Sequence, residues 1–149
     1  MKDSGTLRML FQTVSLFGTP FFYIPMTAYF LKTNPNLAIK LILAIVSTEI
    51  ICGAIKYLYP KKRPIPMPSE TLVQKYFAGS FPSVHTARIT AFSVAVILSA
   101  NGITAILIGL FAMAGVGYSR IYLKKHYFID VMAGFGIGAV LSVAAFMIQ

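Results

Sequence analysis

Charge, acidic residues and cysteine are all scarce in this sequence. Only 11% of its 149 residues are Asp, Glu, Lys or Arg, whereas a soluble domain carries about 25%. Four of these residues are acidic and thirteen are basic, which gives a formal net charge of +9. The single cysteine, Cys52, excludes an internal disulfide and any cysteine-based metal site. So little charge is not enough to cover the surface of an ordinary soluble domain.

Apolar residues take the place of the missing charge. They make up 57% of the chain, and the mean hydropathy is +0.76. A positive surplus in a soluble chain would suggest a nucleic-acid partner, but this hydropathy does not suit a soluble nucleic-acid-binding protein. The length fits one domain over residues 1–149. The composition therefore predicts a small, basic, integral membrane protein without a nucleic-acid partner.

Long apolar stretches predict an all-α, polytopic membrane helix bundle. A membrane-spanning helix needs roughly 20 mostly apolar residues, and three runs without charge exceed or approach this length, at 9–31, 89–119 and 131–149. Asn101–Gly102 is a turn signal that divides the second run into two helices. A further apolar stretch, at about 37–59, holds three charges. In total we expect five spans, near 7–31, 37–59, 83–100, 103–122 and 127–148. Gly18-Thr19-Pro20 predicts a kink in the first span, or an interfacial helix ahead of it.

The polar residues gather at one end of this predicted bundle. Five spans put the amino terminus, the 60–82 loop and the 120–127 loop on one side of the membrane. Eleven of the thirteen basic residues then fall at this end: Lys2, Arg8, Lys56, Lys61, Lys62, Arg63, Lys75, Arg88, Arg120, Lys124 and Lys125. His85, His126 and Asp130 belong to the same end. The positive-inside rule explains lysines in loops, but it does not explain histidines and an aspartate at helix ends.

These residues are suited to phosphate chemistry. His126 and Asp130 are four residues apart and share a helical face, so the carboxylate can hold one imidazole nitrogen and leave the other free to react. Pro82 suits the first turn of a helix, where the N–H groups of Ser83 and Val84 would offer an anion site. The surrounding positive charge would repel a divalent cation, so neither a metal nor another cofactor is expected.

Three motifs in order resemble the signatures of the type 2 phosphatidic acid phosphatase (PAP2) superfamily of integral membrane lipid phosphatases. Lys56 through Pro64 matches Lys-x6-Arg-Pro, and Ser119 through Asp130 matches Ser-Arg-x5-His-x3-Asp. Residues 82–85, Pro-Ser-Val-His, match Pro-Ser-Gly-His except that Val84 replaces the glycine. The resemblance covers about residues 50–140. A valine still donates its N–H where the position is helical, so we expect catalysis to survive the replacement.

The resemblance implies a role for each matching residue. His126 is the implied nucleophile, which forms a phosphohistidine, and Asp130 orients it. His85 is the implied general acid, which protonates the leaving group. The implied phosphate-binding residues are Lys56, Arg63, Ser83, Val84 and Arg120. Water attacking the phosphohistidine would complete hydrolysis without a metal.

Other charged residues receive different interpretations. We expect Lys61, Lys62, Lys124 and Lys125 to be surface charges that attract anionic lipid. Arg88 is expected either to contact a second phosphate or headgroup, or to reach toward the lipid headgroups. Glu49 lies inside a predicted span, where carboxylates usually have a partner, and we expect it to support Lys56 through a buried hydrogen bond or ion pair.

The expected activity is removal of the terminal phosphate from a lipid phosphate or diphosphate that enters sideways between the helices. The candidate substrates are phosphatidylglycerophosphate, undecaprenyl or another polyprenyl diphosphate, lipid A 1-phosphate and phosphatidic acid. The alternatives are a lipid phosphotransferase that uses the same site and an inactive lipid-binding membrane protein. The positive-inside rule alone would put this end of the bundle in the cytoplasm, but the cations of the site add to the number of basic residues that the rule counts. We therefore expect a plasma (inner) membrane protein whose site faces outward, toward the periplasm. The oligomeric state is left open.

Overall fold

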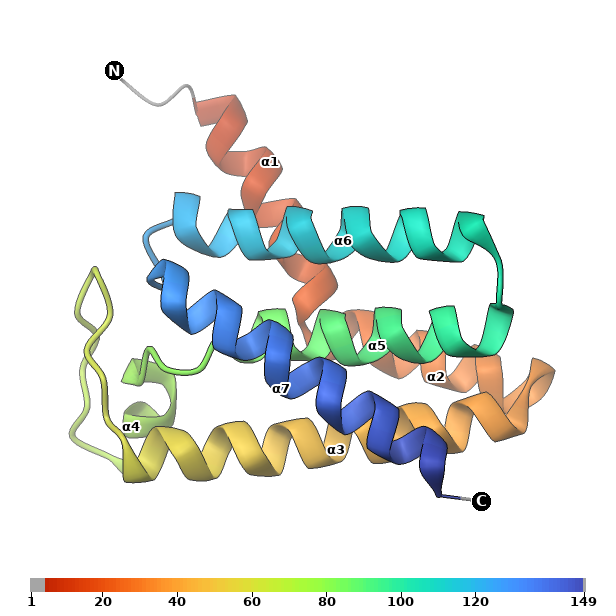
Figure 1. The fold of residues 1–149 in the computed structure, drawn as a ribbon. Helices are drawn as coiled ribbons and strands as arrows, with labels where there is room; N and C mark the ends of the chain where they lie inside the picture. The colour runs from red at the N-terminus through yellow and green to blue at the C-terminus, as the bar shows by residue number, and fades with distance from the viewer. Residues whose placement is uncertain (1–4, 149) are drawn as a thin grey trace.

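In the computed structural model, which describes residues 5–148, every regular element is a helix (Figure 1). Lys2, expected at the basic end of the bundle, lies outside the described residues. In chain order the elements are α1 (Gly5–Ser15), the 3-10 helix η1 (Leu16–Gly18), α2 (Pro20–Thr33), α3 (Pro35–Leu58), α4 (Leu72–Ala78), α5 (Val84–Ala100), α6 (Ile103–Tyr122) and α7 (Phe128–Met147). The predicted all-α class is confirmed.

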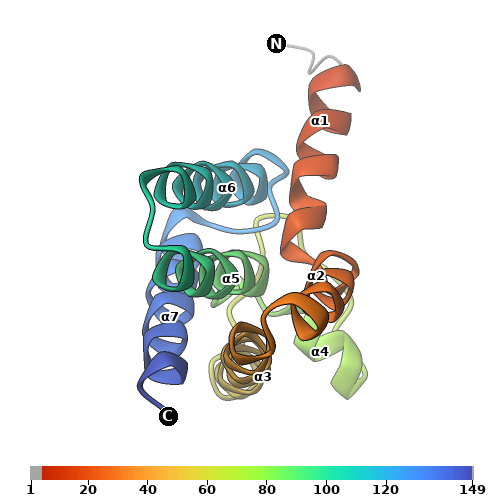
Figure 2. The same ribbon diagram turned by 90° about the vertical axis from the view of Figure 1, so that its right-hand side faces the viewer.

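Helix α5 forms the centre of the bundle and packs against α3, α6 and α7. Figure 2 shows α3, α5 and α6 nearly end-on, with α1 crossing them on one side. Small side chains fill the contacts between the helices, such as the cluster of Ala44 on α3, Ala91 on α5 and Ala145 on α7. Large apolar side chains point outward instead, with Phe21 and Phe111 84% and 82% exposed. Such an inside-out arrangement suits a bundle whose surroundings are lipid rather than water.

The candidate spans agree with the predicted membrane bundle. Helices α3, α6 and α7 are long and apolar enough to cross a membrane, and α1 with α2 counts as a fourth span if the bent pair is taken together. The bend between them is 46° and confirms the kink expected at Gly18-Thr19-Pro20. The remaining predicted span corresponds to α5, which is apolar but has only 17 residues, at the lower end of the length that a span requires.

Close contact between α5 and α7 brings two parts of the site together. A Cβ atom on Gly134 would lie 2.6 Å from the Ser83 carbonyl oxygen, and one on Gly138 would overlap the Ala87 carbonyl. The hydroxyl of Ser142 donates a hydrogen bond of 2.9 Å to the Ala91 carbonyl, one helical turn further along. Glycine at this interface therefore lets the backbones touch, as expected for small residues in membrane helix packing.

Candidate active site

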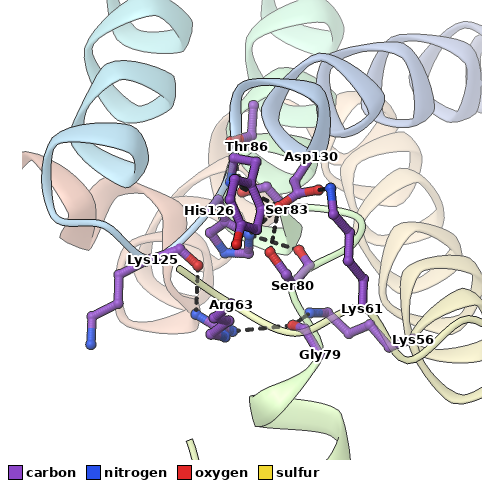
Figure 3. A network of polar contacts seen from close by, with 11 residues as sticks. Lys56, Lys61, Arg63, Gly79, Ser80, Ser83, Thr86, Lys125, His126 and Asp130 are labelled. Carbon is purple, nitrogen blue, oxygen red and sulfur yellow. Dashed lines mark hydrogen bonds and ion pairs between the residues drawn. The ribbon is translucent and has the colours of Figure 1, made fainter. Parts of the chain in front are cut away.

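The three predicted motifs meet at one end of the bundle (Figure 3). Lys56 lies in the last turn of α3 and Arg120 in the last turn of α6. Ser83 caps the start of α5, while His126 lies in the connection from α6 to α7. Arg63 reaches the same region from the loop after α3. Helix ends and the two loops beside them thus bring residues that are far apart in sequence to one place.

His126 is held by a residue outside the three motifs. Its side chain is buried, and its Nδ1 lies 2.7 Å from the carbonyl oxygen of Ser80. A carbonyl only accepts hydrogen bonds, so Nδ1 carries the proton and Nε2 carries the lone pair. Asp130 Oδ2 lies 3.8 Å from Nδ1, on the expected face. Ser80 therefore orients the ring together with Asp130, and no sequence pattern marked it.

Asp130 is fully buried, and its carboxylate accepts three hydrogen bonds. Oδ1 accepts from Lys61 Nζ at 2.6 Å, while Oδ2 accepts from the Ser80 hydroxyl and from the Tyr127 N–H at 2.9 Å. The expectation that Lys61 is a surface charge is wrong, because the loop after α3 folds back over the start of α7. A 2.7 Å bond from Ser80 N–H to the Lys61 carbonyl holds this loop in place.

Burial lowers the pKa of His126 to about 4, although the nearby Asp130 carboxylate acts in the opposite direction. The positive charges of Arg63, Arg120 and Lys56 lower this pKa further. The imidazole is therefore neutral at pH 7, which is the form that a nucleophile requires.

The predicted phosphate-binding cations surround the same segment. Lys56 is buried and donates to the Gly79 carbonyl. Arg63 reaches that carbonyl through Nη2 and the Lys125 carbonyl through Nη1, both at 3.4 Å. Within residues 5–148, the Nε atoms of Arg63 and Arg120 are buried without a hydrogen-bond partner. A buried donor without a partner costs about 1–3 kcal/mol, and phosphate oxygens would satisfy both.

The helix start at α5 differs in part from the expectation. The Ser83 N–H is donated to the Asp130 carbonyl at 2.9 Å, so it ties α5 to α7 and is not offered to an anion. The Ser83 hydroxyl pairs with Thr86 Oγ1 at 2.9 Å. Val84 is the first residue of α5, and its buried side chain packs with Cys52. The valine therefore fits the helical backbone in place of glycine.

Helix α4 places the segment that carries Gly79 and Ser80. It lies within the 60–82 loop, where no helix was predicted, and it begins with a capping box between Thr71 and Gln74. The Tyr76 ring on α4 lies 5.6 Å below the Lys56 ammonium, centroid to Nζ. This short helix and the segment after it thus hold both the Lys56 ammonium and the His126 ring in place.

Glu49 has a different partner from the one expected. Its carboxylate pairs with Arg88 on α5, not with Lys56, and accepts a 3.0 Å hydrogen bond from the Tyr76 hydroxyl. Arg88 is likewise neither at a phosphate nor at the headgroups, because Nη1 donates to the Gly18 carbonyl at 3.2 Å. The packing of α3 against α5 sets this pairing. Tyr76 connects Glu49 with Lys56, since its hydroxyl binds the carboxylate and its ring lies near the Lys56 ammonium.

The fold and the site together define a class: a helical membrane protein with a buried histidine–aspartate pair among cations that suit phosphate. The sequence matches the PAP2 superfamily over residues 37–149, and the chain belongs to this family. It is thus an integral membrane hydrolase of the PAP2 lipid phosphatase type. Helices α1 and α2 precede the matched region.

One relative and two solved structures are similar to nearly the whole of this chain. The chain is 29% identical to an undecaprenyl-diphosphatase of Sulfolobus acidocaldarius, over 97% of this chain and 72% of that protein. Its fold is similar to the crystal structure of Aquifex aeolicus LpxE, with a TM-score of 0.83, 22% identity, and coverage of 98% of this chain and 88% of that one. It is also similar to a PAP2-type phosphatidylglycerolphosphate phosphatase from Bacillus subtilis, with a TM-score of 0.79, 20% identity, and coverage of 98% and 78%.

Proposed function

We propose that this chain hydrolyses the terminal phosphate of a lipid phosphate or diphosphate through a phosphohistidine on His126, without a metal. The observation that carries the proposal is the 2.7 Å contact between His126 Nδ1 and the Ser80 carbonyl. This contact leaves Nε2 as the nucleophile, in a ring that burial keeps neutral. Arg63 and Arg120 supply buried N–H donors without partners, which are suited to the charge that develops in phosphoryl transfer.

The reaction proceeds in two displacements at phosphorus. Nε2 of His126 attacks the terminal phosphorus, the bond from phosphorus to the lipid oxygen breaks, and His85 gives that oxygen a proton. Water then attacks the phosphohistidine, the phosphorus–nitrogen bond breaks, and His85 accepts the proton from water. Asp130 stabilises the charge on the His126 ring during attack, from 3.8 Å. Orthophosphate leaves, and the enzyme returns to its starting state.

The similar proteins support lipids that end in a phosphate as the substrates. An undecaprenyl-diphosphatase and a phosphatidylglycerolphosphate phosphatase are among them, while lipid A 1-phosphate and phosphatidic acid stay as further candidates. All four share an apolar anchor and a terminal phosphate, which a site at the end of a membrane bundle can receive from the bilayer. Entry between helices suits a chain whose outward face is apolar.

A panel of these lipids tests the proposal. The purified protein in detergent with EDTA should release phosphate from at least one lipid at the rate seen without EDTA. Phosphate is measured by colorimetry, and the His126→Ala variant in the same detergent is the control. Complete dependence on a divalent cation would contradict the mechanism, and an absence of release from every lipid would contradict the function.

We also infer that the site faces outward from a plasma membrane. The positive-inside rule counts Lys and Arg in the loops and near the ends of the spans, yet several cations at this end are held by partners within the protein: Lys56 and Arg63 at Gly79, Lys61 at Asp130, and Arg88 at Glu49. These cations do not report orientation.

Cysteine labelling in intact cells tests this orientation. In a Cys52→Ala background, a membrane-impermeant maleimide should label Ser69→Cys in the exposed 60–82 loop. It should leave Thr33→Cys, at the exposed opposite end, unlabelled until the cells are opened. The reverse pattern would put the site in the cytoplasm.

A further inference from the structure

One face of α1 contributes polar side chains beside the active site. Arg8, Gln12 and Ser15 follow a spacing of four and three residues, so they lie on the same side of the helix. With Ile65, Arg120, Leu123 and Lys125 they line a cavity of about 210 Å³. Three of the seven lining residues are cationic and none is acidic. A cavity of this composition attracts an anion and repels a cation.

Arg120 connects this cavity with the phosphate site. Only 7% of the residue is exposed. Its Nη1 donates to the Ser15 hydroxyl, while its Nε is buried and has no hydrogen-bond partner within the described chain. Helix α1 thus already holds one edge of the guanidinium, and an oxygen-rich anion beside it would satisfy the other donor.

The cavity also lies near the group expected to protonate the leaving oxygen. Gly18, one turn beyond Ser15, packs so closely on His85 that a Cβ atom on the glycine would lie 2.7 Å from the His85 Cβ. Ser15 at the end of α1 therefore touches Arg120, and Gly18 in the adjoining η1 touches His85. A second cavity, of about 540 Å³, shares no lining residue with the first, and Lys62 and Lys75 line it together with Lys56 and Arg63.

We propose that Arg8 and Gln12 complete, with Arg120 and Lys125, a subsite for the phosphoryl group that the product retains, so that the substrate is a lipid diphosphate. This inference rests on the proposed function. The bond that breaks joins the terminal phosphorus to the bridging oxygen, which takes the proton from His85 and stays on the inner phosphate. The products are a lipid monophosphate and orthophosphate, whose new oxygen comes from water. The inner phosphate then lies beside Arg8, Gln12 and Lys125, and Arg120, which also lines the cavity, lies between it and the phosphorus that is attacked.

Arg8→Gln in the full-length protein tests this subsite. The variant should lower kcat/KM for a polyprenyl diphosphate by about ten- to a hundredfold, as expected for the loss of a charged hydrogen bond. The kcat/KM for the monophosphate of the same polyprenol should change less than threefold. Lys75→Gln, which lines the other cavity, is the matched control and should leave the ratio of the two values unchanged. Gln12→Ala should shift the ratio in the same direction as Arg8→Gln, by less.

Binding of an uncleavable lipid provides a second measurement. The inhibition constant of a polyprenyl methylenediphosphonate should rise tenfold or more in Arg8→Gln, while that of the matching monophosphonate stays the same. Thermal unfolding checks that the variant is folded, which the exposure of Arg8 favours.

Four outcomes would overturn the inference and leave the proposed function standing. The first is an equal loss of kcat/KM on both lipids in Arg8→Gln, and the second is a loss in Lys75→Gln that is selective for the diphosphate. The third is that the wild type cleaves monophosphates alone. The fourth is that orthophosphate inhibits Arg8→Gln more weakly than the wild type while the lipid preference is unchanged. The last would assign the cavity to free phosphate. An absence of phosphate release from every lipid would instead overturn the proposed function itself.

Discussion

Replacement of His126 by glutamine should reduce phosphate release by about a thousandfold or more, because the nucleophile of the first displacement is lost. The glutamine amide can still donate to the Ser80 carbonyl, which now accepts from Nδ1 at 2.7 Å, so the local structure should survive. The measurement is the rate of phosphate release at saturating lipid, with thermal unfolding to show that the variant is folded. Wild-type turnover in this variant would remove His126 from the mechanism.

His85→Gln is the matched control, because the two histidines differ in the step they serve. A general acid matters only when the leaving group needs a proton. In the first turnover on a nitrophenyl phosphate, whose leaving group is stable as an anion, His85→Gln should therefore release nitrophenolate at a rate close to the wild type, whereas His126→Gln should release none. The second displacement, in which His85 takes the proton from water, should stay slow in His85→Gln. Equal release by both variants would show that the roles are assigned wrongly.

The protonation state of His126 provides a test that does not depend on turnover. Its pKa of about 4 means that the neutral ring with the proton on Nδ1 persists from pH 7 down to about pH 4, and the charged ring appears only below it. Ring nitrogen shifts in ¹⁵N-histidine-labelled protein, assigned with His85→Gln, report this directly. Titration of His126 near the ordinary value of about 6.5 would contradict the neutral nucleophile.

Gly138→Leu should prevent the bundle from folding correctly. Even the first atom of the new side chain would overlap the Ala87 carbonyl, and a backbone group in a packed helix cannot turn aside as a side chain can. We expect a loss of more than about 3 kcal/mol in unfolding free energy, the upper end of the range for overpacking. Separation of α7 from α5 would also break the bond from Ser83 N–H to the Asp130 carbonyl, so activity should disappear as well.

Gly136→Leu is the control for this prediction. It makes the same chemical change two residues earlier on α7, where an added Cβ atom meets nothing within 4 Å. The control should keep the melting temperature and the lipid phosphatase rate near the wild type, while Gly138→Leu loses both. Similar melting temperatures for the two variants would show that α5 and α7 do not pack as closely as described.

The features that depend on local sequence were predictable. Charge-free runs identified the long helices, and Gly18-Thr19-Pro20 identified the break in the first span, because hydropathy and proline act within a few residues. The three motifs located His126, Asp130 and the predicted phosphate-binding cations at or beside helix ends, and Val84 fits the helical backbone. The catalytic roles of these residues stay predictions until variants are measured.

The features that depend on tertiary contacts were missed. Lys61 looks like any loop lysine until the loop folds back onto Asp130, 69 residues further along the chain. The Ser80 carbonyl and the Arg88 partner of Glu49 follow from helix packing, which no local pattern encodes. Helix α4 is an exception, since Thr71 and Gln74 form a capping box, which is a local signal for the start of this helix.

The ion pair of Glu49 and Arg88 has a consequence for how the protein reaches its membrane. A lone charge within the hydrocarbon layer costs about 2.5–3.5 kcal/mol, so α3 and α5 are each poorer membrane segments alone than together. During synthesis α3 emerges first and holds an uncompensated carboxylate until α5 follows. Arg88 then neutralises it and, through the Gly18 carbonyl, holds the bend between α1 and α2. We therefore expect Arg88, in the second half of the chain, to stabilise the amino-terminal half in the membrane by pairing with Glu49.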